Sequence, residues 1–402
     1  MDHPVASLIL KNGRDKPIRN RHPWIFSGAV SEIVGSVPEP GQLVDVRNSD
    51  GDWLACGYCN PESQILTRIL SWDAEEAIDR HFWSKRAAQA IELRKLLELE
   101  PETTAYRLIN AEADGLPGLI LDKYGDYLVI QCLTAGIDRR KELLVELLVE
   151  LLNPTGVVER SDASVRRKEG LRKASGILYG SGPPSQLVIA ENGLQMYADL
   201  YQGHKSGLYL DQRDNRAIIS DPSHTAGRDV LNVFAYTGAF ALYAARTGAS
   251  TITNIESSPS LLEVARMNMR LNNQTRPQDT YLAGDAFQIL RQLRKENRGY
   301  DLAILDPPKF AKSQKDVTAA SRGYKDLNMQ ALHIVRPGGV LATFSCSGLI
   351  GLDLFQKILF AAAIDSGRNV QIIKFLSQAA DHPISVTFPE SAYLKGFLCR
   401  VL

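Results

Sequence analysis

The feature that most constrains the fold is a regular alternation of strand-like and helical runs from about residue 187 onward. Strands are expected at 229–234, 251–256, 279–283, 301–305, 339–345 and 370–376. Helices fit between them at 238–247, 259–272, 286–296, 319–335 and 350–366. Such alternation predicts a parallel sheet of Rossmann-like type, with helices covering both of its faces.

The first 186 residues follow other patterns. Short strands such as 43–46 and 65–70, separated by turns rich in Gly and Pro, predict a small β-barrel at the N-terminus. Amphipathic helices within 75–99 and 139–152 then alternate with strands near 118–122 and 127–133. We therefore expect an α/β protein with a small β-barrel domain, a central mixed α/β domain and a C-terminal Rossmann-like domain, over residues 1–74, 75–186 and 187–402.

Composition excludes several classes of protein. The 402 residues carry 46 Lys and Arg against 46 Asp and Glu, so any nucleic-acid contact must come from local basic patches. The N-terminus lacks the pattern of a signal peptide and no long apolar run follows, so we expect a cytoplasmic protein without a membrane segment. Cys56 and Cys59 have the spacing of half a zinc knuckle, but no second pair accompanies them, so we expect no metal site.

Ligands of such sheets bind beyond the carboxyl ends of the strands. The first strand is followed by Phe234-Ala235-Tyr236-Thr237-Gly238, a tight turn with one glycine. The three-glycine dinucleotide motif is missing, and the bulky Phe234 and Tyr236 would hinder a pyrophosphate. This turn favours an uncharged ribose or thioether ligand and disfavours an oxidoreductase.

Acids follow the next strands. Glu256 could accept both hydroxyls of a ribose, and Asp285 could accept an adenine amino group. Either acid alone could equally be a helix N-cap or a first-turn charge. At consecutive strand ends, however, the two together favour an adenosine site.

The fourth and fifth strands end in groups that can do chemistry. Asp306 is followed by Pro307-Pro308-Lys309, and two prolines fix the backbone beside the acid. Cys346 ends the fifth strand between two serines. A buried, inert thiol is a common alternative for a cysteine, but the small polar neighbours and the nearby acid favour a nucleophile. Lys309 could assist by its position.

Several ordered segments carry a resemblance. They are Arg21–Ala29, Asp114–Gly118, Gly203–Gly207, Tyr209–Asp214, Phe234–Gly238, Asp306–Phe310, Arg322–Asp326, Phe344–Gly348 and Ala379–Pro383. With them the chain resembles, nearly end to end, the RlmI family of bacterial large-subunit ribosomal RNA cytosine-5 methyltransferases. The resemblance implies an N-terminal PUA domain, a class I methyltransferase domain, S-adenosylmethionine as cofactor and 23S rRNA as partner.

The implied reaction is methylation of a cytosine at carbon 5. Carbon 5 is a poor nucleophile, and addition of a thiolate to carbon 6 activates it, which is the role expected for Cys346. Asp306 would grip cytosine N3 and also border the cofactor, whose methionine end Gln212 and Arg213 could cover. Gln212 and Arg213 could instead form a surface cap with a salt bridge, and we interpret His204 as structural.

RNA contact is expected from basic patches. Arg166, Arg167 and Lys168 form one with Arg172 and Lys173, beside Arg160, and the other comprises Arg14, Lys16, Arg19 and Arg21. A basic run can also be merely a solvated surface. Two other functions stay open: a base-nitrogen RNA methyltransferase, which would not need Cys346, and a non-catalytic RNA-binding assembly factor. The sequence also leaves open whether the chain forms a homodimer.

Overall fold

The computed structural model describes residues 3–203 and 205–402, so His204 lies outside the described residues. The chain forms two compact units. Unit 1 comprises the chain through Ile189 together with Ala198–Leu210 and Ala380–Ser391. Unit 2 comprises Ala190–Tyr197, Asp211–Ala379 and Ala392–Leu402. No helix in the described ranges is both long enough and apolar enough to cross a bilayer.

Unit 1 begins with a six-stranded sheet in the order β2-β6-β5-β4-β1-β3. Its strands are β1 (Ala6–Leu10), β2 (Trp24–Phe26), β3 (Val30–Gly35), β4 (Leu43–Arg47), β5 (Trp53–Cys59) and β6 (Ile65–Ser71). The predicted strands at 43–46 and 65–70 are β4 and most of β6. Short elements connect them, namely α1 (Lys16–Arg19) and the 3-10 turn η1 (Ser27–Ala29).

A second sheet of unit 1 has the order β11-β10-β9-β8-β7. Its strands are β7 (Ala105–Asn110), β8 (Leu119–Tyr124), β9 (Tyr127–Cys132), β10 (Gly156–Ser161) and β11 (Ala174–Gly180). The accompanying helices and turns are α2 (Arg80–Lys95), η2 (Ala111–Asp114), α3 (Ala135–Asp138), α4 (Lys141–Leu152) and η3 (Ser164–Glu169). We did not predict β7, because Arg107 interrupts its apolar pattern. In the fold, that guanidinium is buried and donates to Asp122 over 2.8 Å.

The two sheets of unit 1 share one hydrophobic core, which includes Leu43, Tyr58, Trp83 and Leu121. The buried Tyr58 hydroxyl donates to the carbonyl of Pro117 over 2.5 Å. Polar contacts add to this core. Arg68 of β6 forms two hydrogen bonds to the buried Glu169 carboxylate, at 3.2 and 3.0 Å. The first two predicted domains therefore lie within one compact unit, and their boundary at 74/75 remains a prediction.

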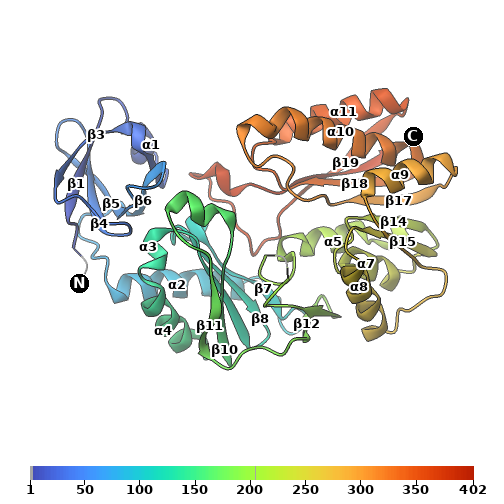
Figure 1. The fold of residues 1–402 in the computed structure, drawn as a ribbon, viewed down its shortest axis with the longest axis horizontal. Coiled ribbons are helices and arrows are strands. Elements are labelled where there is room, and N and C mark those ends of the chain that lie inside the picture. The colour runs from blue at the N-terminus through green and yellow to red at the C-terminus, as the bar shows by residue number, and fades with distance from the viewer. Residues whose placement is uncertain (1–2, 204) are drawn as a thin grey trace. The chain divides into compact units, whose positions relative to one another are not determined.

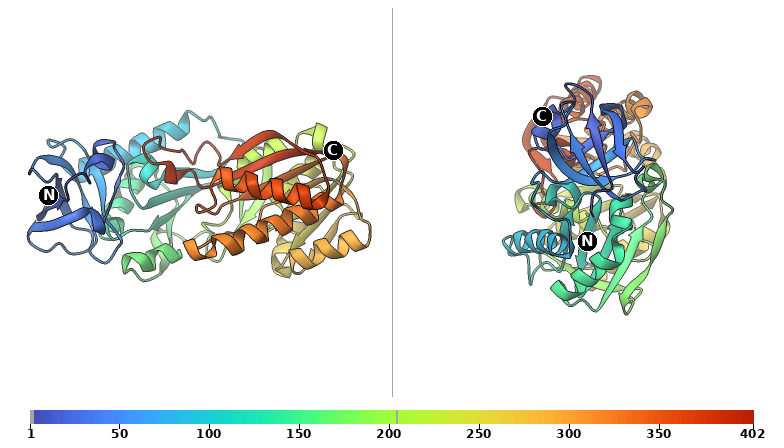
Figure 2. Two further views of the ribbon diagram at one scale, coloured as in Figure 1. Left: turned by 90° about the horizontal axis from the view of Figure 1, so that it is seen from above. Right: turned by 90° about the vertical axis from the view of Figure 1, so that its left-hand side faces the viewer.

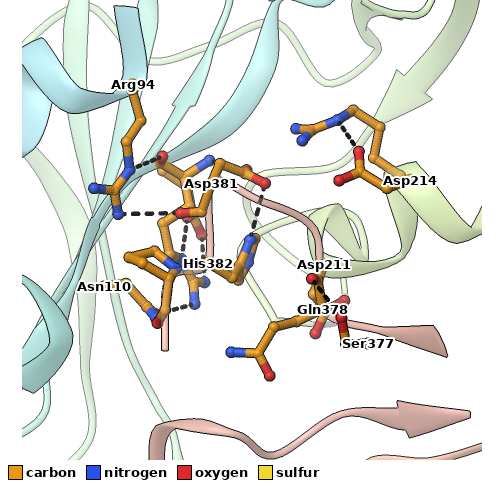
Figure 3. Close-up of polar contacts among 12 residues, drawn as sticks. Arg94, Asn110, Asp211, Asp214, Ser377, Gln378, Asp381 and His382 are labelled. Atoms are coloured by element: carbon orange, nitrogen blue, oxygen red, sulfur yellow. Dashed lines mark hydrogen bonds and ion pairs between the residues drawn. The ribbon is translucent and has the colours of Figure 1, made fainter. Parts of the chain in front are cut away.

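Unit 1 is completed by a segment from near the C-terminus (Figure 3). Asp381 is fully buried, and its Oδ2 accepts the backbone N–H of Arg107 over 2.8 Å. The Arg94 guanidinium donates to the Asp381 carbonyl over 3.1 Å, and the Asn110 amide donates to the Pro383 carbonyl over 3.1 Å. These contacts make the Ala379–Pro383 sequence motif, at least in part, an anchor of the fold.

Unit 2 contains a seven-stranded sheet in the order β16-β15-β14-β17-β18-β20-β19. Its strands are β14 (Asp229–Val233), β15 (Thr251–Glu256), β16 (Thr280–Ala283), β17 (Tyr300–Leu305), β18 (Val335–Ser345), β19 (Val370–Ser377) and β20 (Lys395–Val401). All six predicted strands are present. These six strands are parallel to one another, as predicted, and the one that was missed, β20, lies antiparallel between β18 and β19.

The helices of unit 2 form two groups, which Figure 1 shows on opposite sides of the sheet. One group comprises α5 (Arg213–Ile219), α7 (Ala239–Arg246) and α8 (Pro259–Leu271), and the other comprises α9 (Ala286–Lys295), α10 (Val317–Ile334) and α11 (Leu352–Ser366). Helices α10 and α11 lie side by side in Figure 2. The remaining elements are β12 (Leu187–Glu191), β13 (Leu194–Ala198), α6 (Pro222–Thr225) and the turns η4 (Leu210–Gln212), η5 (Gln314–Asp316) and η6 (Pro389–Ser391).

Candidate active site

The predicted site residues of unit 2 follow the carboxyl ends of neighbouring parallel strands. Val233, the last residue of β14, pairs with Ile255 of β15 and with Leu305 of β17. Leu305 in turn pairs with Thr343 of β18. The residues that follow these strands therefore gather at one edge of the sheet, where ligands of open α/β sheets bind.

The turn after β14 has an unusual backbone. Phe234, Tyr236 and Gly238 all have positive φ angles, of 60°, 49° and 77°. Only glycine adopts this left-handed region without steric cost. Non-glycine residues held in such strained conformations cluster at active sites and ligand-binding loops, where the surrounding structure keeps them in place.

Glu256 holds this turn in place. Its Oε2 accepts the backbone N–H of Tyr236 over 3.0 Å. Its Oε1 accepts the Ser257 hydroxyl over 2.9 Å and the Ser258 N–H over 3.1 Å. The carboxylate is thus fixed at the end of β15 by contacts to both of its oxygens.

Asp285 is exposed and caps helix α9, where its Oδ1 accepts the N–H of Gln288 over 2.9 Å. The N-cap alternative considered for this acid therefore describes its contact in the protein. Capping uses one carboxylate oxygen, so it does not prevent a second contact with a ligand.

Asp306 is held from the segment that precedes α5. The Gln212 amide donates to Asp306 Oδ1 over 2.9 Å, and the Gln212 Oε1 accepts from Asn215 over 2.6 Å. Asn215 also donates to the carbonyl of Ser377. Gln212, predicted to contact the cofactor, thus orients Asp306. Its neighbour Arg213 is buried and donates to Asp214 over 3.0 Å (Figure 3).

Cys346 lies beside the Asp-Pro-Pro segment. Its thiol donates to the carbonyl of Pro307, with 3.9 Å between Sγ and the oxygen. The serines on either side are buried, and the Tyr324 hydroxyl contacts both of them, at 3.0 Å for Ser345 and 3.1 Å for Ser347. The backbone around the half-buried thiol is therefore held by a polar network from α10.

The other four cysteines are buried. Burial raises the pKa of Cys56, Cys132 and Cys399 to about 12 and that of Cys59 to about 11. Thiols with such pKa values carry almost no thiolate at neutral pH, and the thiolate is the reactive form. Within residues 3–203 and 205–402, Cys346 is the one cysteine that is not buried.

Lys395 interacts electrostatically with both Cys346 and a second lysine, Lys309. Lys309 is exposed in the loop after the two prolines. Lys395, the first residue of β20, is buried and pairs in register with Ser345. We did not predict Lys395, because the last strand was missed. The signal was present, since a lysine that opens an otherwise apolar run, Gly396-Phe397-Leu398-Cys399, is unusual.

The basic patch of unit 1 is smaller than predicted. Arg166 is buried, and its guanidinium donates to the carbonyl of Cys132, to the carbonyl of Arg172 and to Asp138. It is therefore not available at the surface, because these acceptors hold it inside. Arg167 and Lys168 are exposed, as are Arg172 and Lys173. Arg160 is buried, and it donates to the carbonyls of Leu200 and Gly203.

Comparisons with known proteins show which families and proteins this chain is similar to. A family model described as S-adenosylmethionine-dependent methyltransferase matches residues 161–399. A PUA-like domain model matches residues 8–72. Ribosomal RNA large subunit methyltransferase I of Aliivibrio fischeri is 47% identical over 398 residues, which are 99% of this chain and 100% of that protein. The protein of the same name from Shewanella amazonensis is 48% identical over 394 residues, 98% of this chain and 99% of that protein.

The chain belongs to this family. It is an S-adenosylmethionine-dependent methyltransferase with a PUA-like N-terminal domain. The crystal structure of SMU.776 complexed with S-adenosylhomocysteine has the same fold, with a TM-score of 0.86 over 98% of this chain and 99% of that one, at 23% identity.

The groups at the sheet edge fit S-adenosylmethionine. Glu256 and Asp285 offer carboxylate acceptors for ribose hydroxyls and an adenine amine at neighbouring strand ends. The segment Phe234–Gly238 contains no Lys or Arg, so it lacks a cation that would favour a phosphate. Gly238 also keeps this turn close to helix α8, where a Cβ atom would meet Ala265.

Proposed function

We propose that this methyltransferase modifies carbon 5 of a cytosine in 23S rRNA through a covalent adduct with Cys346. The observation that carries the proposal is the position of this half-buried thiol, 3.9 Å from the carbonyl oxygen of Pro307, the residue that follows Asp306. The relatives' name, ribosomal RNA large subunit methyltransferase I, supports the class of substrate. A ribosomal substrate also agrees with a cytoplasmic location.

In the proposed reaction the Cys346 thiolate adds to carbon 6 of the cytosine and forms an S–C6 bond. Electron density moves to carbon 5, which becomes nucleophilic. S-adenosylmethionine supplies the methyl group that carbon 5 takes up. A base then removes the proton of carbon 5, the S–C6 bond breaks and the thiolate is regenerated.

Asp306 is proposed to hold the cytosine by N3, where charge develops as the thiolate adds. A group that is already oriented stabilises such charge more effectively than one that must reorganise. The hydrogen bond from Gln212 supplies that orientation, since it fixes one carboxylate oxygen. Lys309 is proposed to assist as a nearby positive charge at the exposed end of the loop.

Glu256 and Asp285 are proposed to hold the adenosine part of the cofactor, together with the turn that includes Phe234, Tyr236 and Gly238. Arg213 remains a proposed cofactor contact. For the RNA, the proposal relies on the exposed Arg167 and Lys168 of unit 1. The target base must leave its stack to reach the thiol, which costs a few kcal/mol and less for an unpaired base.

A trapping experiment tests the mechanism. A 23S rRNA transcript containing 5-fluorocytidine, incubated with the protein and S-adenosylmethionine, should form a stable adduct that maps to Cys346. Fluorine cannot leave as a cation, so elimination fails after methyl transfer. Cys346→Ser should lose both trapping and methylation while still binding S-adenosylmethionine. Cys399→Ser is the matched control, because that thiol is fully buried in β20 and should be dispensable.

The same experiment separates the alternatives. Full activity of Cys346→Ser would overturn the covalent mechanism and favour methylation of a base nitrogen, which needs no thiolate. An adduct on another cysteine would relocate the nucleophile. A protein that binds the transcript but transfers no methyl group to it or to ribosomal particles would favour the assembly-factor alternative.

A further inference from the structure

Lys395 occupies an unusual position for a lysine. Its side chain is buried, with 7% of the residue exposed, and it begins β20 opposite Ser345, the residue before Cys346. Its Nζ donates to the carbonyl of Ser347 over 2.8 Å and to that of Ile350 over 2.7 Å. These two hydrogen bonds hold the turn that directly follows Cys346 in place.

Holding a turn does not require a charge, and a buried ammonium group is costly unless an anion lies nearby. Among the described residues, Lys395 forms no ion pair with a carboxylate, and its third N–H has no acceptor. A neutral donor could satisfy the same two carbonyls. The choice of lysine therefore points to an anion that forms at this site.

We propose that the Lys395 ammonium group, positioned by β20 and by the turn after Cys346, stabilises the thiolate of Cys346. The proposal rests on the proposed function, which requires a thiolate but leaves its source of activation unassigned. Because Cys346 is half-buried, water can accept the proton that the thiol loses. Lys395 is thus a positioning residue that acts through Cys346.

The electrostatics of the site agree with this role. Burial lowers the pKa of Lys395 to about 8, a Cys346 thiolate raises it and Lys309 lowers it. Burial raises the pKa of the Tyr324 phenol, so Tyr324 stays neutral beside the thiol. Asp306 is the acid that follows β17, the strand paired with β18. The cation and the thiolate therefore each favour the charged form of the other.

Alkylation of the thiol tests the proposal without RNA or methyl transfer. The rate at which iodoacetamide modifies Cys346 is followed against pH by mass spectrometry of its peptide. Lys395→Met should slow modification at pH 7 by about tenfold, which corresponds to a thiol pKa about one unit higher. Lys395→Arg keeps the charge and should restore most of the rate. The buried cysteines should not react appreciably in any of these proteins.

Lys374→Met is the matched control, because it makes the same change at an exposed position of the neighbouring strand β19 and should leave the profile unchanged. An unaltered pH profile in folded Lys395→Met would overturn the proposal. If that variant does not fold, as judged by loss of S-adenosylmethionine binding, the reverse measurement decides. The amine of Lys395 is followed by NMR of lysine labelled at Cε, and its signal is assigned by its loss in Lys395→Arg. In Cys346→Ser this amine should titrate at lower pH than in the wild type, because the charges of the thiolate and the ammonium group stabilise each other reciprocally.

An unchanged lysine titration in Cys346→Ser would likewise overturn the pairing. Failure of the Lys395–Cys346 pairing is distinguishable from failure of the proposed covalent mechanism. Absence of a fluorocytidine adduct together with a shifted alkylation profile would reject the covalent mechanism and keep the ion pair. An adduct together with an unshifted profile would keep the mechanism and reject the role of Lys395.

Discussion

Substitution of Gly238 by alanine tests the tight turn at the cofactor site. The residue has a φ angle of 77°, and an added Cβ would lie 2.7 Å from the Cβ of Ala265 in helix α8. Left-handed backbone costs an L-residue about 1–2 kcal/mol. Forcing an extra methyl group into packed surroundings costs about 1–3 kcal/mol. Gly238→Ala should therefore lower the free energy of unfolding of unit 2 by about 2–5 kcal/mol.

A second substitution separates the two contributions. Ala265→Gly removes the methyl group that the new Cβ would meet, at its own cost of about 1 kcal/mol for glycine in a helix. The double variant should therefore be more stable than the sum of the single effects predicts, by about 1–3 kcal/mol. The strain of the left-handed backbone at residue 238 should remain whether position 265 is alanine or glycine.

The assay is urea unfolding followed by far-UV circular dichroism, with S-adenosylmethionine binding measured by calorimetry. All four tryptophans, Trp24, Trp53, Trp72 and Trp83, lie in unit 1, so their fluorescence reports on the unit that does not contain Gly238. A Gly238→Ala protein within about 0.5 kcal/mol of the parent, the size of an ordinary surface substitution, would refute the reasoning. Strict additivity in the double variant would refute the contact with helix α8.

Four further predictions concern charged side chains. Glu256→Ala should weaken S-adenosylmethionine binding by about 1–3 kcal/mol, and unchanged calorimetric affinity in a folded variant would remove its ribose role. Alanine at both Arg167 and Lys168 should reduce the slope of log affinity for RNA against log salt by about 2 in filter binding. Arg166→Ala should instead reduce the free energy of unfolding by about 3 kcal/mol and leave that slope alone, because its buried charge has internal partners. Methyl transfer should rise with pH as the Cys346 thiol ionises, and Lys395→Met should move this rise to higher pH in a pH–rate profile, because it removes the charge that favours the thiolate. A rise at the wild-type pH in the folded variant would contradict this.

Periodicity predicted the sheet of unit 2 well, because each strand is a short apolar run bounded by turn residues and followed by a helix. It placed residues at or just after the strand ends, such as Glu256 and Asp306, at one edge of the sheet, since parallel register brings the strand ends together. It failed at β20, because no helical run follows that strand to mark it. Local sequence could not show that Arg166 turns inward or that Gln212 reaches Asp306, 94 positions away, since both depend on tertiary contacts.

The return of Ala380–Ser391 to unit 1 has a consequence for how the chain is made. The ribosome synthesises a protein from its N-terminus, and domains usually fold in that order as they emerge. Here the ring of Trp24 packs against the ring of Phe388, with 4.7 Å between their centroids. This contact cannot form until almost the whole chain has been synthesised. The unit that contains the N-terminus therefore stays incomplete until nearly the whole chain has been made, and a premature stop codon before residue 380 would remove a segment from each of the two units.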